Sequence, residues 1–221
     1  MVIAIDGPAG AGKSTVAKRI AQKLGFLYID TGAMYRALTL KAMREYAPLE
    51  DEAALARLAA QARIRLVSSG AGALKVFLGE EDVSEQIRKP AVTKYVSEIA
   101  RLKAVREVML GLQRQLGQGA DCVVDGRDIG TVVFPDAEKK FYLDAGFKER
   151  GMRRYKELRE KGEAVSLQDI EADVANRDRI DSTREVAPLK QAADAVYIDT
   201  TQMTIEEVVA KVLEYCTDGH R

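Results

Sequence analysis

The stretch Gly7-Pro8-Ala9-Gly10-Ala11-Gly12-Lys13-Ser14 decides the fold of this 221-residue chain. It follows the apolar run Val2–Ile5, which predicts a buried strand, and it opens a helical pattern that reaches Leu24. In the spacing Gly-x4-Gly-Lys-Ser, glycines let successive backbone N–H groups face a phosphate, Lys13 adds charge, and the Ser14 hydroxyl can ligate Mg²⁺. We therefore predict an ATP-binding phosphate loop made of Gly7, Pro8, Ala9, Gly10, Ala11, Gly12, Lys13, Ser14 and Thr15.

Outward from this loop, short apolar runs alternate with helical patterns. Further strands are predicted at Leu27–Ile29, Cys122–Asp125, Lys140–Leu143 and Ala195–Asp199. Further helices are predicted at Ala33–Tyr46, Asp51–Ala62, Ala91–Leu116, Lys148–Lys161, from Ser166, and at Thr204–Tyr215, where Thr204 and Glu207 have capping-box spacing. Because such alternation builds mainly parallel sheets, we predict an α/β fold of three layers around a mostly parallel sheet. The runs Ile64–Val67 and Leu74–Leu78, around Ser68–Gly72, predict an inserted hairpin.

Composition narrows the class of partner. The chain carries 34 basic and 34 acidic residues, so no net charge would hold it on nucleic acid or an anionic membrane. No run approaches the ~20 apolar residues of a membrane span, and the opening lacks the features of a targeting segment. Cys122 and Cys216 form no Cys-x-x-Cys pair, which fits a reducing compartment. We expect a soluble, cytoplasmic, monomeric protein with small-molecule partners.

The residue inventory also limits the chemistry. His220, in the polar tail, is the only histidine, which argues against Ser-His or Cys-His catalysis and against histidine metal sites. A guanine-reading Asn-Lys-x-Asp is missing, because the only asparagine, Asn176, precedes an arginine. The turn Gly126-Arg127-Asp128 after a buried strand is typical of substrate binding rather than of a mechanochemical ATPase. A small-molecule kinase is the favoured class.

Five motifs, in the same order along nearly the whole chain, resemble those of the bacterial cytidylate kinases, which are nucleoside monophosphate (NMP) kinases. They are Ile5–Ser14, Asp30-Thr31-Gly32-Ala33-Met34-Tyr35-Arg36, Val96–Ala100 with Val105-Arg106, Asp125–Pro135, and Arg177-Asp178-Arg179 through Asp181 to Arg184. The resemblance implies transfer of phosphate from ATP, with Mg²⁺, to CMP or dCMP. It also implies one P-loop kinase domain over residues 1–221, with an NMP-binding insertion at about 31–100 and a short helical lid at about 148–166.

The resemblance further implies roles for individual residues. Ser97, Arg106 and Asp128 correspond to residues that read the cytosine ring, and Asp128 and Arg106 offer the acceptor and donors that cytosine requires. Asp181 corresponds to a residue near the ribose hydroxyls. The implied CMP-binding set is Asp30, Thr31, Arg36, Ser97, Arg106, Arg127, Asp128, Asp181 and Arg184. The implied catalytic set is Lys13, Arg127, Arg153, Arg154 and Arg184, with Ser14 on Mg²⁺ through ATP.

Simpler interpretations stay open for several of these residues. Arg106 could pair with Glu107 on a helix surface, Asp128 could hydrogen-bond its own turn, and Asp30 could cap a helix instead of holding Mg²⁺ waters. The charged helix with Arg153 and Arg154 could simply be solvated, and the roles of Arg177 and Arg179 are unassigned. Alternative functions are a P-loop kinase acting on another monophosphate or on a shikimate-like acceptor, and a non-catalytic ATP-binding regulatory protein.

Overall fold

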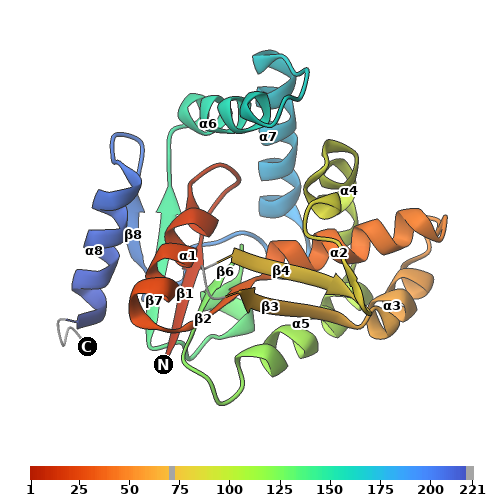
Figure 1. Cartoon of the computed structure of the whole chain (residues 1–221), viewed down its shortest axis with the longest axis horizontal. Coiled ribbons are helices and arrows are strands. Elements are labelled where there is room, and N and C mark those ends of the chain that lie inside the picture. Colours follow the sequence, from red (N-terminus) through yellow and green to blue (C-terminus); the bar gives the residue numbers. More distant parts are fainter. Residues whose placement is uncertain (70–72, 218–221) are drawn as a thin grey trace.

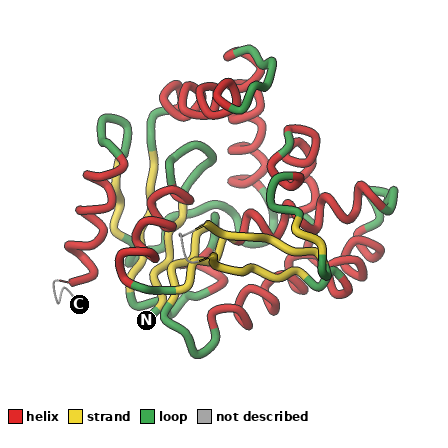
Figure 2. Tube along the Cα trace, viewed as in Figure 1, coloured by secondary structure: helices red, strands yellow, loops and turns green. Residues whose placement is uncertain are grey.

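A central parallel sheet organises the molecule (Figures 1 and 2). A computed structural model describes residues 1–69 and 73–217, and within them the sheet has five strands in the order β2-β6-β1-β7-β8, all paired in parallel. The strands are β1 (Val2–Asp6), β2 (Leu27–Asp30), β6 (Cys122–Asp125), β7 (Lys139–Asp144) and β8 (Val196–Asp199). The predicted α/β class and mostly parallel sheet are confirmed.

Helices cover both faces of this sheet and make three layers. Alternate residues of β1 point to opposite faces, as the strand period of two requires. Ile3 and Ile5 join a cluster with Val16, Ile20 and residues of the C-terminal helix, whereas Ala4 joins Val124 and Leu110 on the other face. The helices concerned are α1 (Lys13–Leu24), α8 (Ile205–Thr217) and α5 (Lys103–Gly117).

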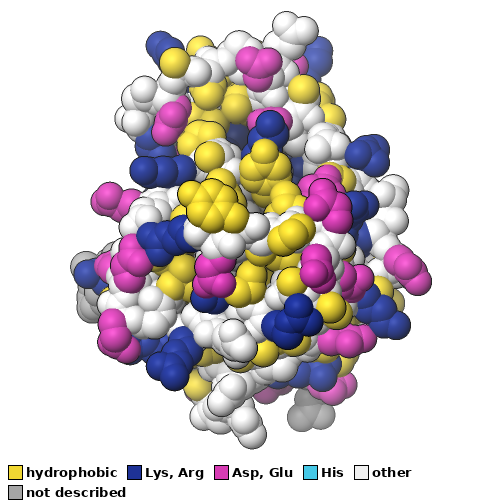
Figure 3. All heavy atoms as spheres, turned by 90° about the vertical axis from the view of Figure 1, so that its right-hand side faces the viewer, with side chains coloured by type: hydrophobic (Ala, Val, Ile, Leu, Met, Phe, Trp, Pro, Cys, Tyr) yellow, Lys and Arg dark blue, Asp and Glu magenta, His cyan; other side chains and the backbone are white. Residues whose placement is uncertain are grey.

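Residues between β2 and α5 form a second body beside the sheet (Figure 1). A small antiparallel sheet, β3 (Ile64–Ser69), β4 (Ala73–Leu78) and β5 (Glu81–Asp82), packs on α2 (Thr31–Arg44). Also present are α3 (Glu52–Gln61), the short 3-10 helix η1 (Gln86–Arg88) and α4 (Pro90–Ala100). The predicted hairpin is confirmed, although residues 70–72 of its turn lie outside the described residues, as does His220. Basic and acidic side chains are interspersed over the face seen in Figure 3.

Two charged helices stand above the carboxyl ends of the strands (Figure 1). They are α6 (Phe147–Glu160) and α7 (Leu167–Thr183), and they pack together through Leu158, Ile170 and Val174. Because α7 also contacts α4, it connects the phosphate-loop side of the molecule with the inserted body. No helix in the described part of the chain is long and apolar enough to cross a membrane.

The prediction of one helix over Ala91–Leu116 is wrong. The chain forms α4 and α5, separated by Arg101 and by Leu102, whose backbone is extended at φ −71° and ψ 125°. Helical periodicity did not reveal the break because both helices bury an apolar face in the same cluster, into which Leu102 also packs. The π-helical turn η2 (Ile129–Val133), β5 and η1 were not predicted, while the expected Thr204–Glu207 capping box is confirmed.

Candidate active site

The phosphate loop crosses from β1 to α1 in a conformation that only glycine permits. Gly7 has φ 145°, and a Cβ there would lie 1.9 Å from the Leu143 carbonyl oxygen of β7. Gly12 caps α1 in the left-handed region, at φ 85°, and no side chain caps the helix. Backbone N–H groups at the start of α1 therefore stay available for a phosphate, which is how helix N-termini bind anions.

Lys13 is buried at the centre of this loop. Its ammonium group donates to the Pro8 carbonyl at 2.7 Å, so the side chain folds back along the loop. Burial lowers the pKa of Lys13 well below its usual range, and the charge of Arg127 lowers it further against the opposing effect of Asp125. A phosphate oxyanion would relieve this cost, because it supplies the opposite charge that the buried ammonium group needs.

Asp125, at the end of β6, connects the sheet to the phosphate loop. The Ser14 hydroxyl donates to Asp125 Oδ2 at 2.7 Å, and the Tyr28 hydroxyl donates to Oδ1 at 2.9 Å. Burial, followed by the neighbouring Asp30 carboxylate, raises the pKa of Asp125 to about 6. The sequence placed Asp125 at the end of a predicted strand and at the start of one of the five motifs, without a role of its own. The sequence feature that could have revealed its role is an acidic residue at the end of a buried strand. In the sheet, strand pairing places Asp125 beside Ile5.

The oxygen atoms of Ser14 and Asp125 suit Mg²⁺, which prefers hard oxygen ligands and binds through one or two carboxylates plus phosphates. Nowhere in the described residues, this site included, do three His, Cys, Asp or Glu side chains gather as a metal cluster. Asp30 is less available for this purpose. Its Oδ1 accepts from the Ala33 N–H at 2.7 Å as the helix cap of α2, and its Oδ2 pairs with Arg36 at 2.9 Å.

Asp128 lies between two buried arginines. It accepts from Arg106 of α5 through Oδ2 and from Arg184 through Oδ1 at 3.1 Å, and all three side chains are buried. The Arg106 guanidinium also lies 5.7 Å from the ring of Tyr35. Arg106 therefore does not make the surface pair with Glu107 that was one interpretation. A buried acid with two donors around it offers the acceptor and donor pattern that reads the edge of a base.

Asp6 holds the turn that carries Asp128. Its two carboxylate oxygens accept from the N–H groups of Ile129 and Gly130, each at 2.8 Å. Burial raises the pKa of Asp6 to about 6, although these two hydrogen bonds favour the ionised form. The carboxyl end of β1 is thus fastened to the segment that follows β6.

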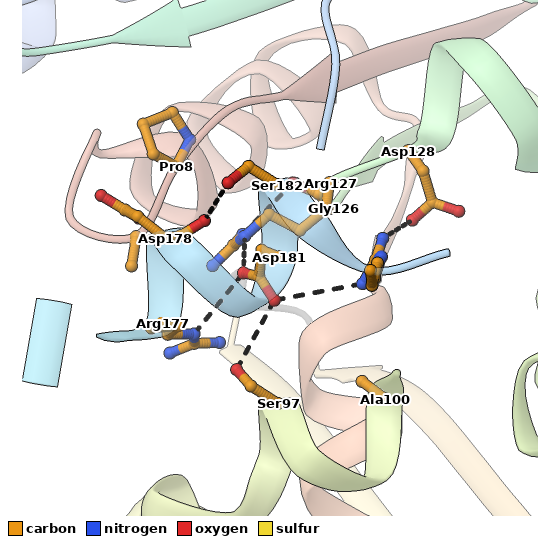
Figure 4. A network of polar contacts seen from close by, with 12 residues as sticks. Pro8, Ser97, Ala100, Gly126, Arg127, Asp128, Arg177, Asp178, Asp181 and Ser182 are labelled. Atoms are coloured by element: carbon orange, nitrogen blue, oxygen red, sulfur yellow. Dashed lines mark hydrogen bonds and ion pairs between the residues drawn. The ribbon is translucent and has the colours of Figure 1, made fainter. Parts of the chain in front are cut away.

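An arginine cluster surrounds Asp181 of α7 (Figure 4). Asp181 Oδ2 accepts from Arg127 Nε at 2.8 Å, and Arg184 and Ser97 approach Oδ1 at 4.0 and 3.5 Å. Burial alone would raise the pKa of Asp181, but Arg127, Arg177 and Arg184 outweigh it and hold the pKa below its usual range. Arg184 also pairs with Asp128, but Arg127 and Arg177 share Asp181, so the cluster keeps a positive charge that suits phosphates.

Arg177, for which the sequence predicted no role, belongs to this cluster. Its Nε lies 3.9 Å from Asp181 Oδ2, too far for a hydrogen bond, and no other partner reaches that nitrogen among the described residues. Burial and the charge of Arg127 lower its pKa to about 10. A signal was present, because Ile170, Val174, Arg177 and Asp181 follow a single helix face. Arg179 is exposed and bonds Asn176 instead.

The two remaining residues of the implied CMP set, Thr31 and Arg36, both belong to α2. The Thr31 hydroxyl donates to the Asp125 carbonyl at 2.7 Å, and Arg36 is held by Asp30. Arg36 Nε, buried, has no hydrogen-bond acceptor among the described residues. Thr31 thus borders the start of the turn that holds Arg127 and Asp128, and the charge of Arg36 is felt at Arg177.

The arginines of α6 are not gathered into the cluster. Arg153 bonds Glu149 at 2.9 Å and the Thr200 carbonyl at 2.7 Å, and Arg154 bonds Glu157 at 2.7 Å. Arg150, which we did not single out, donates instead to the Ala9 carbonyl of the phosphate loop at 3.1 Å and also binds Asp178 of α7. Arg150 therefore joins α6 and α7 to the phosphate loop.

Comparisons with known proteins agree with this site. The family model described as cytidylate kinase matches residues 3–218. A cytidylate kinase from Pelotomaculum thermopropionicum is 52% identical over 219 residues, covering 99% of this chain and 97% of that protein. One from Bacillus velezensis is 53% identical, covering 96% and 94%. The crystal structure of an uncharacterized protein from Eubacterium ventriosum, 10% identical with a TM-score of 0.53 over 99% of both chains, shares the fold alone. This chain belongs to the cytidylate kinase family.

Proposed function

We propose that this enzyme transfers the γ-phosphoryl group of ATP to the phosphate of CMP or dCMP, giving ADP and CDP or dCDP. The observation that carries this proposal is the position of Asp128. Asp128 lies between Arg106 and Arg184, and it directly follows Arg127, a member of the arginine cluster. A base-reading group and a phosphate-binding group thus adjoin a phosphate loop, as a kinase for a nucleotide acceptor requires.

The chain's own residues would act mainly by positioning two anions. The loop amides and Lys13 bind the donor phosphates, while Arg127 and Arg177 neutralise charge between donor and acceptor. An acceptor phosphate oxygen attacks the γ-phosphorus in line, the bond from γ-phosphorus to the bridging oxygen breaks, and ADP leaves with that electron pair. A phosphate monoester needs no general base at neutral pH. Mg²⁺ would be held through Ser14 and Asp125 and would supply further charge neutralisation on the phosphate oxygens.

Cytosine recognition is assigned to Asp128, Arg106 and Ser97. Asp128 would accept from the exocyclic amino group, and Arg106 would donate to the ring acceptors. Uracil reverses part of this pattern and leaves buried partners unpaired, at about 1–3 kcal/mol each. Discrimination of roughly tenfold to hundredfold per contact follows.

Two parts of the fold are assigned to substrate closure. Residues 31–100 would form the NMP-binding insertion, because they carry Ser97 and pack against the helix that carries Asp181. Residues 148–166 would form the lid. Between its two candidate arginines we favour Arg154, because Arg153 is already bound to Thr200, whereas the charge of Arg154 is felt at Arg177 and lowers the pKa there.

A coupled ADP-release assay tests the proposal across CMP, dCMP, UMP, AMP, GMP and shikimate. We expect CMP and dCMP to give the highest kcat/KM, with UMP at least tenfold lower. Equal or faster turnover of UMP or AMP would refute the base assignment, and turnover of shikimate alone would favour that alternative. ATP binding without acceptor-stimulated turnover would indicate a regulatory protein. We also propose a monomer acting in the cytoplasm, and sedimentation tests the first point.

A further inference from the structure

Tyr28 makes a contact that the proposed reaction does not use directly. The side chain lies within β2, in the sheet core, is 7% exposed, and packs in the cluster that contains Ile3 and Val123. Its hydroxyl donates to Asp125 Oδ1 at 2.9 Å, while the other oxygen, Oδ2, accepts from Ser14 at 2.7 Å. One carboxylate thus receives a donor from the sheet on one oxygen and a donor from the phosphate loop on the other.

The two donors differ in how firmly they are held. Ser14 belongs to the loop that must accommodate nucleotide, whereas the Tyr28 ring is fixed by core packing and by strand pairing, in which Tyr28 lies beside Val123 and Asp30 beside Asp125. The backbone of Asp125 is fixed as well, because Thr31 donates to its carbonyl. What remains free is rotation of the carboxylate, since this terminal torsion is broad in aspartate.

The electrostatic surroundings make this rotation matter. The Asp30 carboxylate is close enough to disfavour the charge of Asp125, and burial disfavours it further. A buried carboxylate oxygen without a donor would turn towards any available N–H or O–H group, because leaving it unpaired is costly. The hydroxyl of Tyr28 prevents that turn by occupying Oδ1.

We propose that Tyr28 is a positioning residue for metal-linked nucleotide binding: its hydroxyl fixes the rotation of the Asp125 carboxylate, so that Oδ2 stays directed at Ser14 and the donor phosphates. This inference rests on the proposed kinase function only in requiring that Mg²⁺ and nucleotide bind at the phosphate loop. It assigns to a core tyrosine a role that its burial would otherwise attribute to packing.

The test is Tyr28→Phe, which keeps the ring and removes only the hydroxyl. Calorimetric titration with ADP is run with Mg²⁺ and with a chelator, and the ratio of the two dissociation constants measures metal-linked binding. We expect that ratio to fall about tenfold, mostly through weaker binding with Mg²⁺, and kcat to fall about tenfold while the KM for CMP changes less than twofold. These changes are expected because Tyr28→Phe removes one hydrogen bond to a charged group, Asp125.

A matched control exists at the opposite edge of the same sheet. Tyr197 of β8 donates to Asp144 of β7 at 3.4 Å, and its side chain is 49% exposed. Tyr197→Phe removes the same kind of contact at the end of a parallel strand without touching the phosphate loop. Its Mg²⁺-linked binding ratio and its kcat are expected to equal those of the unaltered enzyme.

A double-mutant cycle with Asp125→Asn separates positioning from packing. If Tyr28 acts through Asp125, adding Tyr28→Phe to Asp125→Asn changes the binding ratio by less than twofold. An unchanged ratio in Tyr28→Phe alone, or an equal weakening of ADP binding with and without Mg²⁺, overturns the proposal. Because the titration uses no acceptor, it stands or falls separately from the assignment of CMP.

Discussion

Arg127 Nε donates to Asp181 Oδ2 at 2.8 Å and thereby connects the turn after β6 with α7. Without a bound substrate, this carboxylate is the negative charge that the surrounding arginines share. Burial lowers the pKa of Arg127, but the charge and hydrogen bond of Asp181 outweigh burial, so that the pKa of Arg127 is raised. Ligand phosphates would therefore bind to an arginine cluster whose charge Asp181 already neutralises in part.

Replacement of Asp181 by asparagine should destabilise the free enzyme. The change leaves Arg127 and its neighbours without their shared counterion, and breaking a buried pair of this kind costs about 3–5 kcal/mol. Urea unfolding should report a loss of about that size. Sodium sulfate should restore more stability to Asp181→Asn than it adds to the unaltered enzyme, because an oxyanion replaces the missing charge. Equal gains at matched ionic strength would contradict this account.

Replacement of Lys13 by methionine should separate activity from stability. Removing the ammonium group abolishes its hydrogen bonds to the donor phosphates, and at about 1.5–3 kcal/mol for each such bond kcat/KM for ATP should fall by about 100-fold or more. Burial disfavours the charge of Lys13 in the free enzyme. The variant should accordingly unfold at the same urea concentration as the unaltered enzyme or a higher one, and a clear loss of stability would count against this interpretation.

Replacement of Asp128 by asparagine should weaken base selection. Asparagine keeps the shape of the side chain but loses one acceptor oxygen and the charge that holds Arg106 and Arg184. We expect kcat/KM for CMP to fall by roughly tenfold to hundredfold and the preference for CMP over UMP to decrease. The KM for ATP should change less than twofold, and a preserved CMP/UMP ratio would remove Asp128 from the recognition set.

Two arginines on the same helix provide a matched pair. Arg177 belongs to the cluster around Asp181, whereas Arg179 is exposed and bonds Asn176. Arg177→Ala should lower kcat by about 100-fold, since it removes a charge next to the transferred group. Arg179→Ala should leave kcat within twofold, and the steady-state rate with saturating CMP and ATP measures both. Similar losses in the two variants would show that α7 is oriented differently.

The buried carboxyl of Asp6 predicts a pH dependence of stability. Its pKa rises to about 6 in the folded protein from an ordinary value of 3.8, so the folded state binds the proton more tightly than the unfolded state between these values. This contribution is complete below pH 3.8 and is lost as pH rises through 6. At about 1.4 kcal/mol per unit, the total is about 3 kcal/mol.

Comparison with Asp6→Asn isolates that contribution. Urea unfolding from pH 4.5 to 7.5 should show the variant gaining stability, relative to the unaltered protein, as pH rises. Asparagine offers one acceptor where Asp6 offers two to Ile129 and Gly130, which shifts the whole curve but not its slope. A stability difference that does not vary with pH would disprove the shifted pKa.

Local signals were sufficient for much of the fold. The bounds of α1 were predictable because the phosphate loop marks its start and Gly25, at φ 70°, ends it. The break at Leu102 was not predictable. Apolar periodicity describes each helix separately and does not indicate the angle between one helix axis and the next. The contact between Ser14 and Asp125 depends on the pairing of β1 with β6, which joins residues more than a hundred positions apart.

The order of the site along the chain also has a consequence for synthesis on the ribosome. The phosphate loop emerges early, whereas Asp181 and Arg184, at the end of α7, emerge late. A nascent chain that has completed the loop still lacks the counterion of Arg127 and one of the two arginines that hold Asp128. Phosphoryl transfer must therefore wait until the polypeptide is nearly finished.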